Sequence, residues 1–477
     1  MTSAKYNLRG RMLAAAFSAF AVGILAVPAA ADIDEIAELR IAIAELQADY
    51  EARIAELEQR LEAAEREATR KEVARQTPTT MAGQVTAGNQ FNPQVSVVLD
   101  GNYYHDSVGG VGAEILESAL QPSQPTHGAD EHDHGPSNGM NVRSVELASI
   151  TTVDPYFDAS VFLGLESGGD VEIEEAWFAT RGLPGGLRLK AGQLLSEIGY
   201  QNVKHEHEWD FADQNLAYLN LLGDHGLQDA GAQLTWLPEL PLYTLFGVEL
   251  LQGDQARIGA LVEDDAERAE LGLRDPGSGP RMTTVFAKLS PDLGFNHALR
   301  LGGSYVHASL HQEIDVGPQF ETGLEGDAKL WLFDIVYKYD NPAAWGQHDF
   351  SFQAEYLWSQ KDLVATSGDP AGVGKQRRYT TDGLYAQGIY GFAPRWQIGL
   401  RYDVLGLTNK ATGGVGASFD SSDRWTGVLT WTPTEFSRFR VQYSESDILT
   451  FDGSRESFTT VWLQFLMTLG AHGAHRF

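Results

Sequence analysis

The chain has 477 residues, and its 65 Asp and Glu against 35 Lys and Arg give a formal net charge of −30. Nucleic acid is therefore not expected as a partner, because binding phosphate groups needs a basic surface. The absence of cysteine excludes disulfides, thiolate metal sites and cysteine nucleophiles.

Residues 1–31 are typical of a secretory signal peptide, so we expect the protein to be exported. Lys5, Arg9 and Arg11 form a positive start, residues 12–27 are apolar, and three consecutive alanines supply a cleavage site. Removing these three basic residues leaves 32 Lys and Arg against the same 65 Asp and Glu. No other stretch approaches the roughly 20 consecutive apolar residues of a membrane-spanning helix, so a membrane would have to be crossed by strands.

Residues 32–75 have the heptad repeat of an α-helical coiled coil. Ile36 and Leu39 begin its a and d positions, and after Tyr50 the phase advances by four residues, as in a stutter. We expect a coiled coil in the periplasm that joins copies of the chain into a homo-oligomer; the alternative is a single solvated helix. Residues 76–94 have the composition of a linker.

From residue 95 to residue 477 the sequence predicts about 16 strands, each about 8 to 14 residues long. Their starting points lie near Val95, Asn141, Pro155, Gly169, Leu187, Leu227, Leu242, Arg281, His297, Asp327, Gln347, Arg377, Arg395, Ser421, Ser437 and Ser457.

The connections between these strands alternate in length. Every second connection is short and contains proline, and most of the others are long and polar. An even number of antiparallel strands with this alternation predicts an all-β transmembrane barrel in the bacterial outer membrane, with both ends of the barrel chain in the periplasm. The short connections lie at residues 153–155, 183–186, 237–241, 290–294, 341–346, 392–394 and 432–435.

Alternation within the strands supports a barrel with a wet lumen. In the strand near Gln347, Phe350 and Tyr356 lie on one face and Gln353 and Glu355 on the other. A water-soluble sandwich also alternates, but here the polar face repeatedly carries charged residues. We predict a pore lining of mixed charge, made of Arg188, Lys190, Arg300, Arg401, Arg438, Arg440, Asp158, Glu172, Glu174, Glu355 and Asp403.

A histidine-rich tract in the first long connection is a candidate metal site. His127, His132, Asp133 and His134 bring three imidazoles and a carboxylate into a few residues. Imidazole and carboxylate suit zinc, copper or nickel, and a loose tract can wrap around an ion. The alternative is a polar loop without a ligand.

His205 and His207 form the second candidate metal site, in the connection after the fifth strand. In an extended segment, residues two apart face the same way, so the two imidazoles could chelate together. If this connection folds inward, they would line the constriction with Asp210 and Asp213 within reach. The alternative is a structural loop anchored by its aromatic residues.

Four blocks of sequence carry a resemblance to a known family: residues 154–157, 171–178, 187–192 and 205–210. They resemble porin-like outer-membrane proteins of proteobacteria, which are similar to the phosphate-selective porin O and P group and include members labelled zinc-regulated outer-membrane receptors. The resemblance implies a porin, usually a trimer, whereas Ile at a and Leu at d of the coiled coil favour two strands. Trimer and dimer both stay open.

The sequence thus predicts an outer-membrane porin for passive diffusion of small hydrophilic solutes or ions. No enzymatic activity is expected, because the chain has neither a Gly-x-Ser-x-Gly motif nor a glycine-rich phosphate loop before a helix. No cofactor is required, and zinc or another divalent cation is an optional ligand of the loop histidines. Membrane lipid is the expected surrounding. Two alternatives remain: an anion- or phosphate-selective porin, and a non-conducting outer-membrane anchor for the periplasmic coiled coil.

Overall fold

The computed structural model describes residues 93–119, 121–123, 135–166, 171–255, 257–316, 321–413, 417–450 and 453–470. The predicted signal peptide and coiled coil lie outside these ranges, as does the linker except for its last two residues. His127, His132, Asp133 and His134 also lie outside them.

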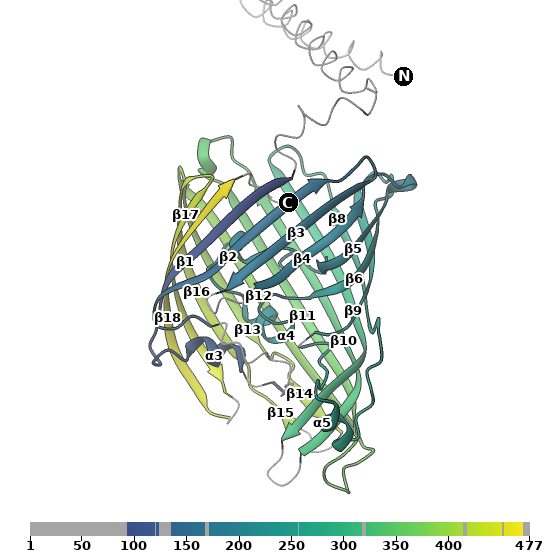
Figure 1. The fold of residues 1–477 in the computed structure, drawn as a ribbon. Helices are drawn as coiled ribbons and strands as arrows, with labels where there is room; N and C mark the ends of the chain where they lie inside the picture. The colour runs from purple at the N-terminus through teal and green to yellow at the C-terminus, as the bar shows by residue number, and fades with distance from the viewer. Residues whose placement is uncertain are drawn as a thin grey trace, which may run out of the picture. The chain divides into compact units, whose positions relative to one another are not determined.

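Sixteen strands of the described chain form one closed antiparallel barrel, which confirms the predicted number (Figure 1). Each pairs with its neighbour along the chain, and β1 pairs with β18 from Ser96↔Gly470 to Asp106↔Thr460, which closes the ring. The strands are β1 (Gln94–Asp106), β2 (Gly139–Thr152), β3 (Phe157–Glu166), β4 (Val171–Thr180), β5 (Leu187–Leu195), β6 (Gln228–Trp236), β7 (Tyr243–Leu251), β8 (Met282–Ser290), β9 (His297–Val316), β10 (Glu321–Tyr339), β11 (Phe350–Ala365), β12 (Gln376–Ala393), β13 (Trp396–Leu405), β16 (Ser422–Thr434), β17 (Ser437–Leu449) and β18 (Arg455–Gly470).

Two further short strands, β14 (Lys410–Thr412) and β15 (Ala417–Ser418), lie in the connection after β13. β14 pairs with β12 and with β15, while β13 pairs directly with β16. They are therefore additions to the sheet and not members of the ring.

Several strands are longer than the predicted limit of about 14 residues. β9 has 20 residues, β10 has 19, and β10 begins at Glu321 instead of near Asp327. Their ladder continues past a register shift between Gly326 and Ala328 into polar pairs such as Thr322↔Asp315 and Glu325↔Gln312. Apolar alternation marks only the part of a strand that faces lipid, about 9–11 residues, so it underestimates a hairpin that extends beyond it.

Three short α-helices and three 3₁₀ turns lie in the described connections. They are α3 (Gly112–Glu117), α4 (Leu216–Leu221), α5 (Asp265–Glu270), η1 (Pro184–Gly186), η2 (Glu206–Glu208) and η3 (Ala344–Gly346). Among the described residues, no helix is long and apolar enough to cross a membrane.

The barrel wall has a polar inner face and an apolar outer face, which is the reverse of the arrangement in a water-soluble protein. Charged residues such as Asp100, Glu355 and Arg424 are buried on the inner face, while Phe333 and Leu400 are 57% and 56% exposed on the outer face. Water-soluble proteins bury their large apolar side chains and expose their charges. An apolar outer band around a polar interior is the arrangement of a barrel surrounded by lipid.

We expect Leu463→Arg to destabilise the barrel by about 2–4 kcal/mol, because this outward-facing residue, 47% exposed, lies in the middle of β18. Leu469→Arg is the matched control: Leu469 is on the same face and 50% exposed, but lies beside the strand's end, where the cost falls to about 0–1 kcal/mol. Denaturant titration of protein folded into lipid vesicles measures the free energy of unfolding. Equal destabilisation by both variants would contradict a lipid-facing outer band.

Candidate functional site

Residues 196–227, which connect β5 to β6, fold into the lumen and are called the inward segment below. Figure 1 shows α4, which belongs to this segment, inside the ring of strands. α4 packs against β11, β12 and β13 of the opposite wall, and all six of its residues are buried. The connection that contains His205 and His207 therefore folds inward, as a position of these two residues in the constriction requires.

A buried carboxylate on β11 holds the start of the inward segment. Glu355, which is 1% exposed, accepts hydrogen bonds from the backbone N–H groups of Tyr200 at 3.2 Å and Gln201 at 2.7 Å. The hydroxyls of Tyr218 and Tyr385 also donate to it, at 2.8 and 2.6 Å. With the Gln353 amide, which donates at 3.4 Å, five groups donate to this buried charge, offset its desolvation and fix the segment against the wall.

Gly199 allows this close approach. Its φ is +58°, and a Cβ there would lie 2.3 Å from the Glu355 carboxylate and 2.5 Å from the Tyr218 hydroxyl. Arg300 of β9 donates to the Gly199 carbonyl. The position therefore has space only for glycine.

A second anchor pairs an acid of the inward segment with two arginines of the wall. Asp213 accepts hydrogen bonds from Arg401 at 2.7 Å, Arg424 at 2.9 Å and Gln442 at 2.9 Å. Asp403 lies between the same two arginines, at 3.0 and 3.2 Å from their Nε atoms. Burial raises the pKa of Asp213, but Arg424 and Arg401 outweigh it and hold that pKa below its usual value.

Aromatic residues of the segment provide a third set of contacts. Trp209 and Phe211 are buried, and Arg440 donates to both of their carbonyls. The Arg401 guanidinium lies 4.6 Å from the centre of the Phe211 ring, and Arg143 lies 5.4 Å from that of Trp209. Trp209 and Phe211 thus anchor the segment, which is what we expect if this connection is a structural loop.

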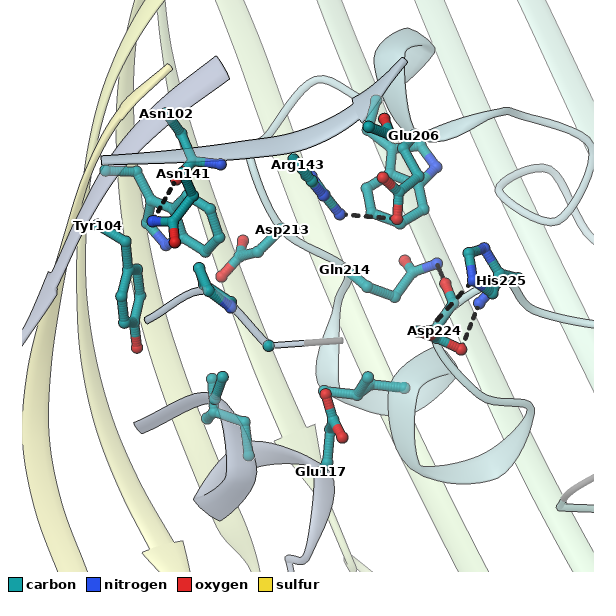
Figure 2. Close-up of a pocket in the computed structure, with 18 of the residues that line it drawn as sticks. Asn102, Tyr104, Glu117, Asn141, Arg143, Glu206, Asp213, Gln214, Asp224 and His225 are labelled. Carbon is teal, nitrogen blue, oxygen red and sulfur yellow. Dashed lines mark hydrogen bonds and ion pairs between the residues drawn. The ribbon is translucent and has the colours of Figure 1, made fainter. Parts of the chain in front are cut away.

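The inward segment lies between two cavities. The first, called the long-loop chamber, has a volume of about 130 Å³ and is lined by α3 and the ends of β1 and β2 that lead into the first long connection. Figure 2 shows Arg143 reaching across it to Glu206, at 2.8 Å, with His225 beside Asp224. Its charged lining is mainly acidic: Glu117, Glu174, Glu206, Asp213 and Asp224 against Arg143, Arg424 and His225.

The second cavity, called the short-turn chamber, has a volume of about 360 Å³. Its wall comes from strand ends next to short connections, such as Lys338 of β10 and Gln397 of β13. Its charged lining is mainly basic: Lys204, Lys338, Arg438 and Arg440 against Glu208 and Asp210. The two chambers therefore have opposite charge.

The structure places most of the predicted pore-lining residues next to the inward segment. These are Arg300, Arg401, Arg438, Arg440, Glu172, Glu174, Glu355 and Asp403. Lys190 lies 4.0 Å from Glu175 of β4. Arg188 and Asp158 lie instead near the short turns. Arg188 is 5.9 Å from the Trp177 ring centre, and Asp158 pairs with Arg181 at 3.4 Å.

Strict alternation missed Glu175, because β4 contains a bulge. Phe162 and Leu163 of β3 pair with Glu175 and Ile173, so Glu174 is the extra residue. Both glutamates consequently reach the same imidazole, that of His205. The adjacent pair of acids in a strand of alternating pattern was the signal for this bulge. Arg143 was missed for the same reason, since a register shift between Asp100 and Gly101 leaves it without a pairing partner.

His205 and His207 lie together, but only His205 has the extended backbone that the sequence predicts, because His207 lies inside the 3₁₀ turn η2. His205 is the N-cap of the 3₁₀ turn η2, and the two rings are 5.9 Å apart and nearly parallel, at 17°. The His205 ring also stacks on Phe162 with centres 4.4 Å apart. A helical turn and a wall aromatic thus set the ring orientation.

Three glutamates of the wall surround these histidines. His205 Nδ1 is 2.7 Å from Glu174 Oε2 and 3.5 Å from Glu146 Oε2, and its Nε2 is 3.6 Å from Glu175 Oε2. His207 Nδ1 is 3.1 Å from the same oxygen of Glu146. Burial lowers the pKa of His205, but hydrogen bonds to Glu174 and Glu175 raise it well above its usual value.

No family model matches the chain. An uncharacterized protein of Aquifex aeolicus is 30% identical over 397 residues, which cover 81% of this chain and 80% of that protein. Solved structures with a similar fold include OmpT, an outer membrane protein of Vibrio cholerae, at 11% identity and a TM-score of 0.45, covering 79% of this chain and 97% of that one. The outer membrane channel DcaP of Acinetobacter baumannii has 12% identity and a TM-score of 0.45, covering 79% and 96%.

We expect Asp213→Ala to loosen the inward segment, because it leaves Arg401 and Arg424 buried with Asp403 as their shared carboxylate. Removing one partner of a buried ion pair costs about 3–5 kcal/mol. Hydrogen exchange of backbone amides in residues 205–222 measures this loosening. Asp210→Ala is the matched control, since Asp210 belongs to the same segment and accepts one hydrogen bond, from Gln387 at 2.8 Å. Equal protection in the two variants would remove Asp213 as an anchor.

Proposed function

The chain belongs to the same family as the uncharacterized Aquifex aeolicus protein, and we propose that it is an outer-membrane porin for passive diffusion of small hydrophilic solutes or ions. The observation that carries this proposal is the inside-out wall: a closed ring of sixteen strands with a charged, buried interior and an apolar outer band. A lipid-embedded barrel with a polar lumen is suited to carry water and small solutes.

The inward segment sets the size of what can pass. It contacts Glu355 of β11 and Arg440 of β17, and its own Asp213 bonds to Arg424 of β16, so three different strands hold it. A solute must pass between this segment and the wall, so we expect selection for small permeants. The polar groups along this route offer hydrogen bonds in place of lost water of hydration.

The opposite charges of the two chambers suggest a direction-dependent preference. A solute that enters from the long-loop side meets the acidic chamber first, which attracts cations. From the other side it meets Lys204, Lys338, Arg438 and Arg440. This basic chamber is the observation that favours the anion-selective alternative, including selectivity for phosphate.

Divalent metal capture is the finer part of the proposal. His205 and His207 lie beside the acidic chamber and contact wall glutamates. His127, His132, Asp133 and His134 belong to the connection between β1 and β2, whose described part includes α3, so we propose that this tract concentrates cations at the mouth.

The rival proposal is a non-conducting anchor for the coiled coil of residues 32–75. It shares the barrel, the surrounding membrane lipid and a homo-oligomeric state, trimeric or dimeric, with the porin proposal. It differs in predicting no route for ions.

Ion current in planar lipid bilayers separates the two. We expect purified full-length protein to give discrete, stepwise currents, and Asp213→Ala to raise the current per step because the segment that narrows the lumen is loosened. The reversal potential in a salt gradient then reports cation against anion preference. Folded protein that inserts but carries no current would support the anchor and contradict the porin.

The cation preference should also depend on pH through His225, which lines the acidic chamber. Burial lowers the pKa of His225, but Asp224, Glu206, Glu172 and Glu174 outweigh it and raise that pKa to about 9. The raised pKa means that the positive charge is present at neutral pH and is lost as pH rises through about 9. We expect the reversal potential to shift toward cations over that window in wild type. The step should be smaller in His225→Gln, and an identical step would contradict this role.

A further inference from the structure

Two histidines of the inward segment and two glutamates of the wall turn their ligand atoms toward one another. The ligand atoms of Glu146, Glu174 and His205 all lie within 4.8 Å of one another. His207 lies next to this group, because its Nδ1 is 3.1 Å from the Glu146 oxygen that also lies 3.5 Å from His205 Nδ1. The group lies beside the long-loop chamber, whose lining includes Glu174.

Three of the separations between these ligand atoms are compatible with a small tetrahedral ion. Bonds of about 2.0–2.2 Å from zinc to nitrogen or oxygen place neighbouring ligand atoms about 3.3 Å apart. The separations of 2.7, 3.1 and 3.5 Å within the group lie on both sides of that value. Two imidazoles with two carboxylates suit zinc and its neighbours, whereas calcium and magnesium favour sets made only of oxygen.

The surroundings of His205 resemble those of a metal-bound imidazole. Its Nε2, on the other side of the ring, is 3.6 Å from Glu175, and Glu175 is 4.0 Å from Lys190. Phe162 stacks on the ring face. A carboxylate behind a ligating imidazole fixes the orientation of the ring and raises its basicity.

The group is also rich in negative charge for its degree of burial. Glu146 is 5% exposed and Glu175 is 2% exposed, while Glu174 borders the chamber. Carboxylates removed from water need a counter-charge close by. A divalent cation at this point would supply it to Glu146 and Glu174, whereas Glu175 also has Lys190 at 4.0 Å.

We propose that Glu146, Glu174, His205 and His207 form a binding site for a divalent transition metal, best matched by Zn²⁺, that fastens the inward segment to β2 and β4. Metal binding is independent of the proposed channel, and only the effect on current rests on it. A bound ion would join residues of the segment to residues of two strands and add positive charge to the acidic chamber. Both effects reduce the passage of cations.

The test uses full-length protein in detergent micelles with His127, His132 and His134 all changed to alanine, so that the histidine tract does not contribute. Isothermal titration with Zn²⁺ should show one bound ion. In this background, changing both His205 and His207 to glutamine should weaken binding by at least about 100-fold, and Glu174→Gln by about 10-fold. His348→Gln is the matched control, because His348 bonds to the Tyr390 hydroxyl next to a short turn and should bind Zn²⁺ unchanged.

Heat-dependent migration on gels shows which variants are folded. If the variant with both histidines changed does not fold, the single variant His207→Gln is tested in its place. Folded background protein that binds no Zn²⁺, or histidine variants that bind it equally well, would overturn the site. In planar bilayers, added Zn²⁺ should reduce the current of the background protein more than that of Glu174→Gln. Protein that binds Zn²⁺ but carries no current would support the metal site and contradict the channel. Protein that carries current but binds no Zn²⁺ would support the channel and contradict the metal site.

Discussion

The fold depends on one constraint, which is that a strand facing lipid has to pair on both sides. Backbone groups left unpaired in hydrocarbon cost several kcal/mol each, so a sheet in a membrane has to close. The pairing of β1 with β18 meets this requirement over eleven residue pairs, from Ser96 to Asp106 on β1. Closure also creates the polar interior, because alternate side chains on every strand must then point at one another across the lumen.

That interior has to satisfy its own charges. Glu355, Asp403 and Arg424 are all nearly inaccessible to water, and each finds partners in the inward segment or beside it. The segment therefore serves two purposes: it supplies donors and acceptors to buried wall charges, and it narrows the space that remains. In this barrel the interactions that stabilise the fold are also those that set the width of the route.

Much of the fold could be predicted from the sequence because lipid and water impose a period of two on every strand. This gave the number of barrel strands and the positions of most of their starts. The same rule failed where the backbone breaks the period: the bulge beside Glu174 brings Glu175 to the lumen, and the shift at Asp100 does the same for Arg143. Residues of the inward segment could be singled out as histidines and acids, but their partners on distant strands depend on the path of the segment, which no local pattern specifies.

The anchors of the inward segment differ in charge balance from one wall to the other. At β13 and β16, Asp213 of the segment and Asp403 of the wall face Arg401 and Arg424, so two acids meet two bases that are always charged.

On β2 and β4, Glu146, Glu174 and Glu175 face histidines, whose charge depends on a proton. The first wall is thus balanced under all ordinary conditions, while the second has Lys190 at 4.0 Å from Glu175 and otherwise depends on a proton or another cation. Changes in pH or in cation concentration should therefore act on the inward segment through its contacts with β2 and β4, next to the acidic chamber.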